Sequence, residues 1–334
     1  MKRLTIVIAV LALLWSGYWF AGSSKLQDEV EGWMSARRAE GWQLDYASFG
    51  VKGFPNRFDL TWHNLAVADP DSGLAVELPD FGIFALSYKP NHVIAAWPET
   101  FALRTLSDRY QVQNEGMRAS LVLKPNTALE LQRAQFTLES LQLDGAGAPA
   151  LVASGPLNMA LAQDEGQAER YRLGLSAEAV QLPAGFVTRL AADRGLPRRI
   201  RALNLDAHVT FADPWDIRAL QDARPQPRRI ELHLARAEWG ELMLQLSADL
   251  TVDETGMASG DVDVQARNWR QMLQMAVSLG AVDARLAETA ERALSSMASI
   301  RGNPETLDLS VTLSDGQVWL GFIPLGPAPS FILR

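Results

Sequence analysis

The stretch "LMLQLSADLTVDETGMASGDVDVQARNW", residues 242–269, places an apolar side chain at every second position of its first half. Leu242, Leu244, Leu246, Ala248 and Leu250 alternate with mostly polar neighbours, and the turn signal "DETG" at 253–256 precedes a second alternating run. A two-residue period is typical of a β-strand with one buried face, and two such runs around a short polar turn form a hairpin. The stretch therefore predicts two antiparallel strands.

The same period recurs along most of the chain after residue 41. Four further segments show it: Tyr171, Leu173 and Leu175; Leu203, Leu205, Ala207, Val209 and Phe211; Ile230, Leu232 and Leu234; Leu307, Leu309, Val311 and Leu313. Intervening residues such as Asn204 and Asp206 are polar, which indicates a sheet with one face in water. We predict a mainly β (α+β) fold, a long antiparallel meander curled into a half-barrel or groove.

Helical patterns interrupt the meander in three places. Residues 183–195 and the segment from Asp213 are short, and we expect them to be caps or crossovers. The segment 268–299 carries apolar residues three or four apart, including Met272 and Met275, which predicts one long helix packed on the apolar face of the sheet. The Met-rich stripe is interpreted as core packing, with an adaptable hydrophobic site as the alternative.

The N-terminus, "MKRLTIVIAVLALLWSGYWFAGSSK", contains an uncharged run from Leu4 to Ala21. These 18 residues would rise about 27 Å as a helix, close to the hydrocarbon thickness of a bilayer. Four aromatic residues gather at the far end of the run, Trp15, Tyr18, Trp19 and Phe20, as at a membrane–water interface. We predict a transmembrane anchor or uncleaved signal over residues 1–22. A cleaved signal is the alternative, because Ala21, Gly22 and Ser23 are small.

The orientation and the division of the remaining chain follow from charge and period. Lys2 and Arg3 precede the apolar run, so the positive-inside rule places the N-terminus in the cytoplasm and exports the rest. Residues 23–41 have helical spacing and predict an amphipathic helix that ends near Gly41. Residues 42–334 then form one exported β-rich domain, in which the loop at 222–229 marks a candidate subdomain boundary.

Composition and motifs argue against several classes of function. A net charge of -8 makes nucleic acid a poor partner, because phosphate binding needs clustered basic residues. The chain has no cysteine and only four histidines, none at a spacing typical of metal ligands. It also lacks nucleophile-elbow, phosphate-loop and dinucleotide-binding motifs. We therefore predict a protein that is not an enzyme, with no catalytic residues, no metal and no cofactor.

The segment "GVKGFPNRFDL", residues 50–60, interrupts the alternation with Gly53, Phe54, Pro55 and Arg57. Proline fixes its own backbone and pushes the preceding residue into an extended conformation, so residues 53–56 predict a tight turn between two strands. A cis peptide bond before Pro55 is one form of such a turn. Arg57 is interpreted as part of a structural ion pair, with anion binding as the alternative.

Three segments carry a resemblance to a known family: "VKGFPNRFDLTWHNL" (51–65), "SYKPNHVIAAWPE" (87–99) and "LSDGQVWLGFIPLGPAP" (313–329). Together they resemble an uncharacterised bacterial family, domain of unknown function 2125, and the resemblance covers most of the chain after the apolar run. It implies an envelope protein of Gram-negative bacteria with one N-terminal membrane segment. The hairpin 242–269 is also similar to repeats of AsmA-like envelope proteins, whose long β-groove is associated with lipid handling.

Two functional hypotheses follow. In the first, the apolar face of the sheet is a groove that binds phospholipid or another hydrophobic ligand, lined by Leu203, Leu205, Leu232, Leu242, Leu244, Leu246, Met272 and Met275. In the second, the core is filled and the chain is an envelope assembly or scaffold protein that acts through contacts with another envelope protein. Either way we expect an inner-membrane, single-pass protein with its main domain in the periplasm. The hypotheses differ in whether the chain's own aromatic residues fill the apolar face.

Overall fold

The computed structural model describes residues 2–145, 148–183, 196–221, 224–278, 280, 284–300 and 303–333. It is a mainly antiparallel β structure with 55% strand, which confirms the predicted fold class. The chain divides into two compact units, unit 1 (residues 1–123 and 136–149) and unit 2 (residues 124–135 and 150–334). The candidate boundary at 222–229 falls within unit 2, where residues 227–229 are part of a strand, and residues 222 and 223 lie outside the described residues.

Unit 1 contains one long helix and nine strands among its described residues. They are α1 (Lys2–Ala39), β1 (Gln43–Asp45), β2 (Ser48–Lys52), β3 (Arg57–Asp69), β4 (Leu74–Leu86), β5 (Lys89–Ala96), β6 (Thr100–Arg104), β7 (Arg109–Glu115), β8 (Arg118–Leu123) and β10 (Ser140–Gly145). Strand β9 (Leu131–Leu138) and strand β11 (Ala148–Ala153) contain residues of both units. Strand β3 is central to one end of the sheet, because it pairs with β1, β2 and β4.

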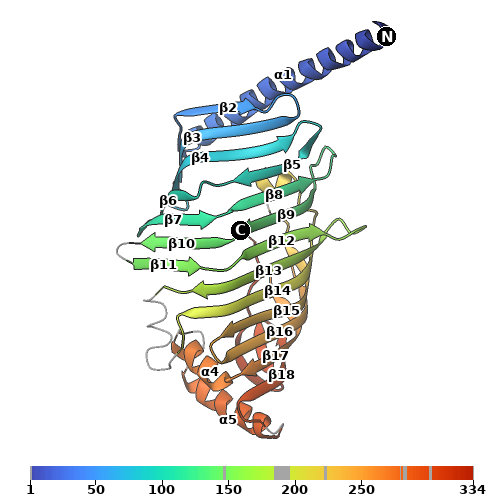
Figure 1. The fold of residues 1–334 in the computed structure, drawn as a ribbon. Helices are drawn as coiled ribbons and strands as arrows, with labels where there is room; N and C mark the ends of the chain where they lie inside the picture. Colours follow the sequence, from blue (N-terminus) through green and yellow to red (C-terminus); the bar gives the residue numbers. More distant parts are fainter. Residues whose placement is uncertain are drawn as a thin grey trace. The chain divides into compact units, whose positions relative to one another are not determined.

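Helix α1 is continuous through the predicted apolar run and the predicted amphipathic segment. From Trp19 onward the helix packs on the sheet, where Trp19 and Met34 join a core with Phe58, Leu60 and Trp62. The helix ends where predicted, because the N–H groups of Gly41 and Trp42 donate to the carbonyls of Arg38 and Arg37. Figure 1 shows the first half of α1 extending beyond the edge of the sheet of unit 1.

Unit 2 is a meander followed by a helical pair. Its further elements are β12 (Leu157–Gln163), β13 (Arg170–Gln181), β14 (Arg199–Phe211), α3 (Arg218–Gln221), β15 (Pro227–Trp239), β16 (Leu242–Val252), β17 (Ala258–Arg267), α4 (Trp269–Ser278), α5 (Ala284–Ile300), β18 (Thr306–Ser314), β19 (Gln317–Leu320) and β20 (Ile323–Pro327). Successive strands from β12 to β20 pair antiparallel, as the alternation predicted. Figure 1 shows β13 to β18 in sequence order, with α4 and α5 at the β18 end.

The helical predictions in unit 2 need one correction. The segment 268–299 forms two helices, α4 and α5, and not one. Gly280 lies between them with φ of 71°, a left-handed conformation through which a right-handed helix cannot continue. Residues 279 and 281–283 lie outside the described residues, as do residues 184–195 of the helix predicted at 183–195. The segment from Asp213 contains the four-residue helix α3, as a short helix was predicted there.

The hydroxyl group of Tyr171 bonds the start of β13 to the start of β9 and to the loop that contains Trp215. Tyr171 is fully buried, and its Oη donates to the carbonyl of Leu131 (3.2 Å) and accepts from the N–H of Trp215 (3.2 Å). Replacing Tyr171 with phenylalanine leaves these buried groups without that partner. We expect Tyr171→Phe to cost about 1–3 kcal/mol of unfolding free energy.

The measurement is the thermal unfolding midpoint of the full chain. Tyr110→Phe is the matched control, because the hydroxyl of Tyr110 contacts only the exposed carboxylate of Asp108 at 3.3 Å among its described hydrogen bonds. The control is expected to change stability by less than about 0.5 kcal/mol. Equal midpoints for the two variants would contradict a structural role for the Tyr171 hydroxyl.

Candidate functional site

The apolar face of unit 2 is built from rows of side chains that cross the strands. Directly paired residues point to the same face of an antiparallel sheet, so the register defines the rows. One row runs from β12 to β18 through Met159, Leu175, Leu205, Ala235, Leu246, Val264 and Leu309. The neighbouring row contains Leu157, Ala177, Leu203, Ala237, Leu244, Ala266 and Leu307. Both rows are almost entirely leucine, alanine and valine.

The two ends of these rows differ in burial. At the β18 end, Leu307 and Leu309 are buried beneath α4 and α5, where Trp269, Met272, Leu273, Leu294 and Ala298 belong to the same cluster. At the β12 to β16 end, Leu203, Leu205 and Leu246 are only partly buried, and Met159 is 47% exposed. Adjacent strands lie about 4.8 Å apart, so the partly exposed part of a row spans roughly 19 Å. An aliphatic surface of this length fits an elongated apolar ligand.

The sequence-predicted groove residues lie on this face, but in different surroundings. The pairing brings Leu203 and Leu244 into one row and Leu205 and Leu246 into the next, while Leu232 lies between Ala207 and Ala248. Leu242 is buried and pairs with Trp239. Met272 packs in the covered cluster at the β18 end, and Met275 is partly buried on the same helix. The partly exposed surface is therefore formed by the leucines of β14, β15 and β16.

Aromatic side chains form much of the core of unit 1, whereas the apolar face of unit 2 is mostly aliphatic. In unit 1 the rings form a continuous chain of contacts: Phe49 with Trp62, Trp62 with Phe81, Phe81 with Trp97, and Trp97 with Phe136. Ring centroids in this chain lie 4.6–6.2 Å apart, within the range of favourable aromatic pairs. Unit 1 therefore has a filled core, whereas the exposed rows of unit 2 are aliphatic.

The opposite face of the same strands is polar and highly charged. Arg172 and Asp206 form a bidentate pair across β13 and β14, with N–O distances of 2.9 and 2.8 Å. The hydrogen bonds from Arg172 lower the pKa of Asp206. A cavity of about 460 Å³ opens beside this pair, and its lining includes Gly174 and Ser176 as well as three residues of the first aliphatic row, Met159, Leu175 and Leu205. The cavity therefore adjoins the partly exposed end of the first aliphatic row.

Two histidines far apart in the sequence meet on the polar face. His208 Nδ1 and His233 Nε2 are 2.9 Å apart, and His208 Nε2 lies 3.4 Å from an oxygen of Asp164. A β-bulge in β15 produces this contact, because it shifts the register between the pairs Asp206–Leu234 and Ala207–Leu232. Sequence reasoning missed the contact, since a bulge leaves no signal in the alternation. The described residues contain no group of three metal-type ligands.

The same bulge changes the position of Leu234. The alternation placed Leu234 with Ile230 and Leu232 on the apolar face, but the structure pairs it with Asp206 of the polar face. The extra residue moves every side chain beyond it by one position relative to the partner strand. As a result Ala235, and not Leu234, is the β15 residue that pairs with both Leu205 and Leu246. Ala235 has the smallest side chain in that row.

A second candidate surface lies where α1 meets the turn at residues 53–56. The peptide bond between Phe54 and Pro55 is cis, and the turn joins β2 to β3 as predicted. The indole N–H of Trp15 donates to the carbonyl of Pro55 (2.9 Å), and that of Trp19 donates to the carbonyl of Arg57 (2.7 Å). Phe54 stacks on Phe20 with ring centroids 5.4 Å apart. The turn is thus the point at which the sheet holds the helix.

Arg57 has two side-chain contacts next to this turn. Its Nε donates to Asp59 at 2.9 Å, and its guanidinium group lies 5.5 Å from the centroid of the Phe84 ring. These contacts agree with the structural ion pair predicted from the sequence. Three of the predicted turn residues, Phe54, Pro55 and Arg57, therefore contact α1, which their sequence pattern did not reveal. Gly53 closes the turn itself, because its carbonyl accepts from the N–H of Arg57.

The fold and these two surfaces define a β-sheet protein with one N-terminal helix that is long and apolar enough to cross a membrane. A sequence model of a family described as "Uncharacterized protein conserved in bacteria", DUF2125, matches residues 19–329. The match covers most of the chain, so the protein belongs to this family. No curated protein and no solved structure is significantly similar to it.

Proposed function

We propose that this protein is a membrane-anchored periplasmic protein that binds lipid acyl chains, or a similarly elongated apolar ligand, on the aliphatic face of unit 2. The observation that supports the proposal is the partly exposed set of leucines on β14 and β16, continuous with a row that α4 and α5 cover at its other end. Exposed apolar surface of this extent is costly in water and is typical of binding sites. The looser similarity of residues 242–269 to AsmA-like repeats agrees with this proposal.

The proposed location follows from α1. Its first 13 residues are mostly apolar and exposed, with Ile8, Leu13 and Leu14 exposed on three different sides of the helix. A helix that is hydrophobic all round favours a lipid environment. Lys2 and Arg3 would remain in the cytoplasm, so we propose that both units lie in the periplasm of a Gram-negative envelope.

We propose binding without catalysis. The described histidines nearest to each other, His208 and His233, bond to one another on the polar face. They therefore lie on the opposite side of the sheet from the leucines that would hold the ligand. Nothing in this arrangement directs a titratable side chain of β14 or β15 toward an apolar ligand.

The alternative, an assembly or scaffold protein with a filled core, is supported by unit 1. Its aromatic chain and the packed half of α1 fill the apolar face there. In this case the partner would be another envelope protein, bound through the outer surface. The experiment below separates the two functions, because only the first requires space on the face of unit 2.

The test is native mass spectrometry with lipid extraction on the full chain, purified from a bacterial envelope in mild detergent. Wild-type protein is expected to retain phospholipid at a fixed stoichiometry. Leu205→Glu should lose most of that lipid, because it puts a charge into the exposed row. Asn204→Glu is the matched control, since the adjacent residue points to the polar face of the same strand and should leave binding unchanged.

A second variant separates a loss of lipid binding from a loss of folding. Ala235→Trp places a large side chain between Leu205 and Leu246 without adding charge. If the face is open, this variant remains folded and excludes lipid. If it unfolds, the face is already filled and the scaffold function is favoured, as it is if wild-type protein carries no lipid.

A further inference from the structure

The joint between α1 and the sheet holds two turns of unit 1 together. The turn at residues 53–56 is bonded to the β4–β5 turn, because the N–H of Ser87 donates to the carbonyl of Asn56 (2.9 Å). Tyr18 of α1 donates its hydroxyl hydrogen to the carbonyl of Ser87 (2.7 Å). Together with the bonds from Trp15 and Trp19, this contact fixes the helix against both turns. We call this surface, comprising residues 53–57 and 86–89, the helix corner.

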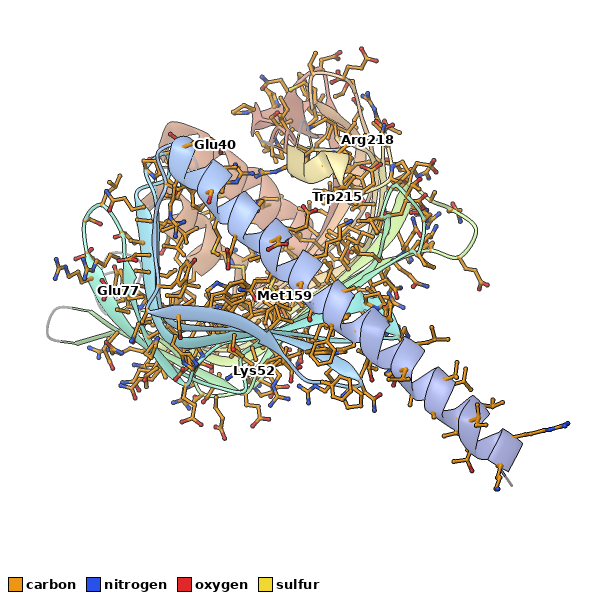
Figure 2. The ribbon with its side chains drawn as sticks, turned by 90° about the horizontal axis from the view of Figure 1, so that it is seen from above. Glu40, Lys52, Glu77, Met159, Trp215 and Arg218 are labelled. Atoms are coloured by element: carbon orange, nitrogen blue, oxygen red, sulfur yellow. The ribbon has the colours of Figure 1, made fainter. Side chains whose placement is uncertain are left out.

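The helix corner exposes large apolar side chains on its outside. Phe54 is 49% exposed, Tyr88 is 64% exposed, and Phe20 and Leu86 are also exposed. Three basic residues, Lys52, Arg57 and Lys89, are exposed on or next to the same turns. Aromatic rings with nearby basic side chains are the composition of a surface at the level of lipid headgroups. Figure 2 shows Lys52 beneath α1, which extends past it toward the N-terminus.

The length of the free helix indicates how close this surface lies to the bilayer. Between Lys2 and Leu14, before the first residue bonded to the corner, α1 has 13 residues and rises about 20 Å. A bilayer has a hydrocarbon core of about 30 Å, so this part alone is too short to cross it. The remaining length is supplied by residues 15–21, which are the residues that pack on the corner. Tilting of the helix would shorten its span further.

We propose that the helix corner is immersed in the headgroup layer of the leaflet that faces unit 1, with Phe54 and Tyr88 among the lipids. This inference rests on the proposed function, because it requires α1 to be retained as an anchor. Unit 1 is then held against the membrane surface in one orientation and does not swing on a flexible linker. The basic side chains of Lys52 and Lys89 extend to lipid phosphates.

The chain has no cysteine, so a fluorophore can be attached to one introduced cysteine at a time. The depth of each labelled position in the bilayer can then be measured. Single-cysteine variants of the full chain, each carrying an environment-sensitive fluorophore, are reconstituted into vesicles of phosphatidylethanolamine and phosphatidylglycerol. Tyr88→Cys reports on the corner. Leu106→Cys is the control, because Leu106 is 89% exposed and lies in the β6–β7 turn, which flanks the opposite end of β4 from Leu86. Val10→Cys reports on the anchor.

The expected result is a blue-shifted emission at position 88 and loss of most of its fluorescence to a lipid spin label placed near the headgroup. The label at position 106 should remain in water and be quenched by soluble iodide. If position 88 behaves like position 106 while position 10 is quenched by a deep spin label, the anchor holds and the immersion is wrong. If position 10 is also in water, the proposed membrane anchoring itself fails.

Discussion

Replacing Gly260 with alanine is expected to destabilise unit 2 by several kcal/mol, on the order of 3–5. Gly260 lies in β17 with φ of 140°, between its partners Leu250 and Leu313. A Cβ atom at this position would lie 2.2 Å from the carbonyl oxygen of Asp249, which is a backbone atom of the paired strand. Relief of that overlap requires β16 and β17 to separate, so the hydrogen bonds of the sheet are lost locally.

Gly174→Ala is the matched control, because it also adds one methyl group to a strand glycine of unit 2. A Cβ at Gly174 would meet no atom within 4 Å. The control is expected to be neutral or to stabilise by up to about 1 kcal/mol, through reduced freedom of the unfolded chain. Urea unfolding of the full chain in mild detergent, followed by circular dichroism, measures both. Similar midpoints for the two variants would show that the backbone at Gly260 adapts.

Trp19→Ala is expected to cost about 3–5 kcal/mol and to release α1 from the sheet. Trp19 is 5% exposed, stacks on Phe58 at 5.9 Å and donates its indole hydrogen to the carbonyl of Arg57. Truncation removes all of these contacts and leaves a cavity under the helix. Because Gly22 lies directly against Phe58, the helix cannot fill the cavity without moving as a whole.

Trp33→Ala provides the comparison within the same helix. Trp33 is 54% exposed, and its main described partner is Arg37, whose guanidinium carbon lies 5.6 Å from the ring centroid. An exposed cation–π pair of this kind contributes about 0.5–1 kcal/mol. Hydrogen exchange of the α1 amides between residues 23 and 39 should accelerate strongly in Trp19→Ala and little in Trp33→Ala. Equal exchange in both would mean that Trp19 does not hold the helix.

Local patterns predicted much of this structure. The alternation at 203–211 and 242–250 identified β14 and β16, and the turn signal at 253–256 lies between the paired strands β16 and β17. Each of these signals is contained within a few residues, because a strand's two-sided burial and a turn's backbone geometry are local requirements. The predicted helix end at Gly41 has the same origin.

The candidate sites were predicted less completely. Leu205 and Leu246 were identified as apolar-face residues, but that they share a row with Ala235 depends on a bulge that no local pattern indicates. The contact of His208 with His233 depends on the same bulge. The division of one predicted helix into α4 and α5 also required the backbone conformation at Gly280.

The sequence by itself determined the strands, the turns, the apolar helix and its end, because these depend on the periodicity and capping of neighbouring residues. Only the tertiary structure decided which residues of different strands form a row and which part of the apolar face is filled. It also decided that Trp15 and Trp19 of α1 form hydrogen bonds with the carbonyls of Pro55 and Arg57. The physical reason is that these contacts join residues far apart in the chain, as in the bond between Trp15 and Pro55, which are 40 positions apart. Their energies depend on register, bulges and packing, which one strand or helix cannot specify alone.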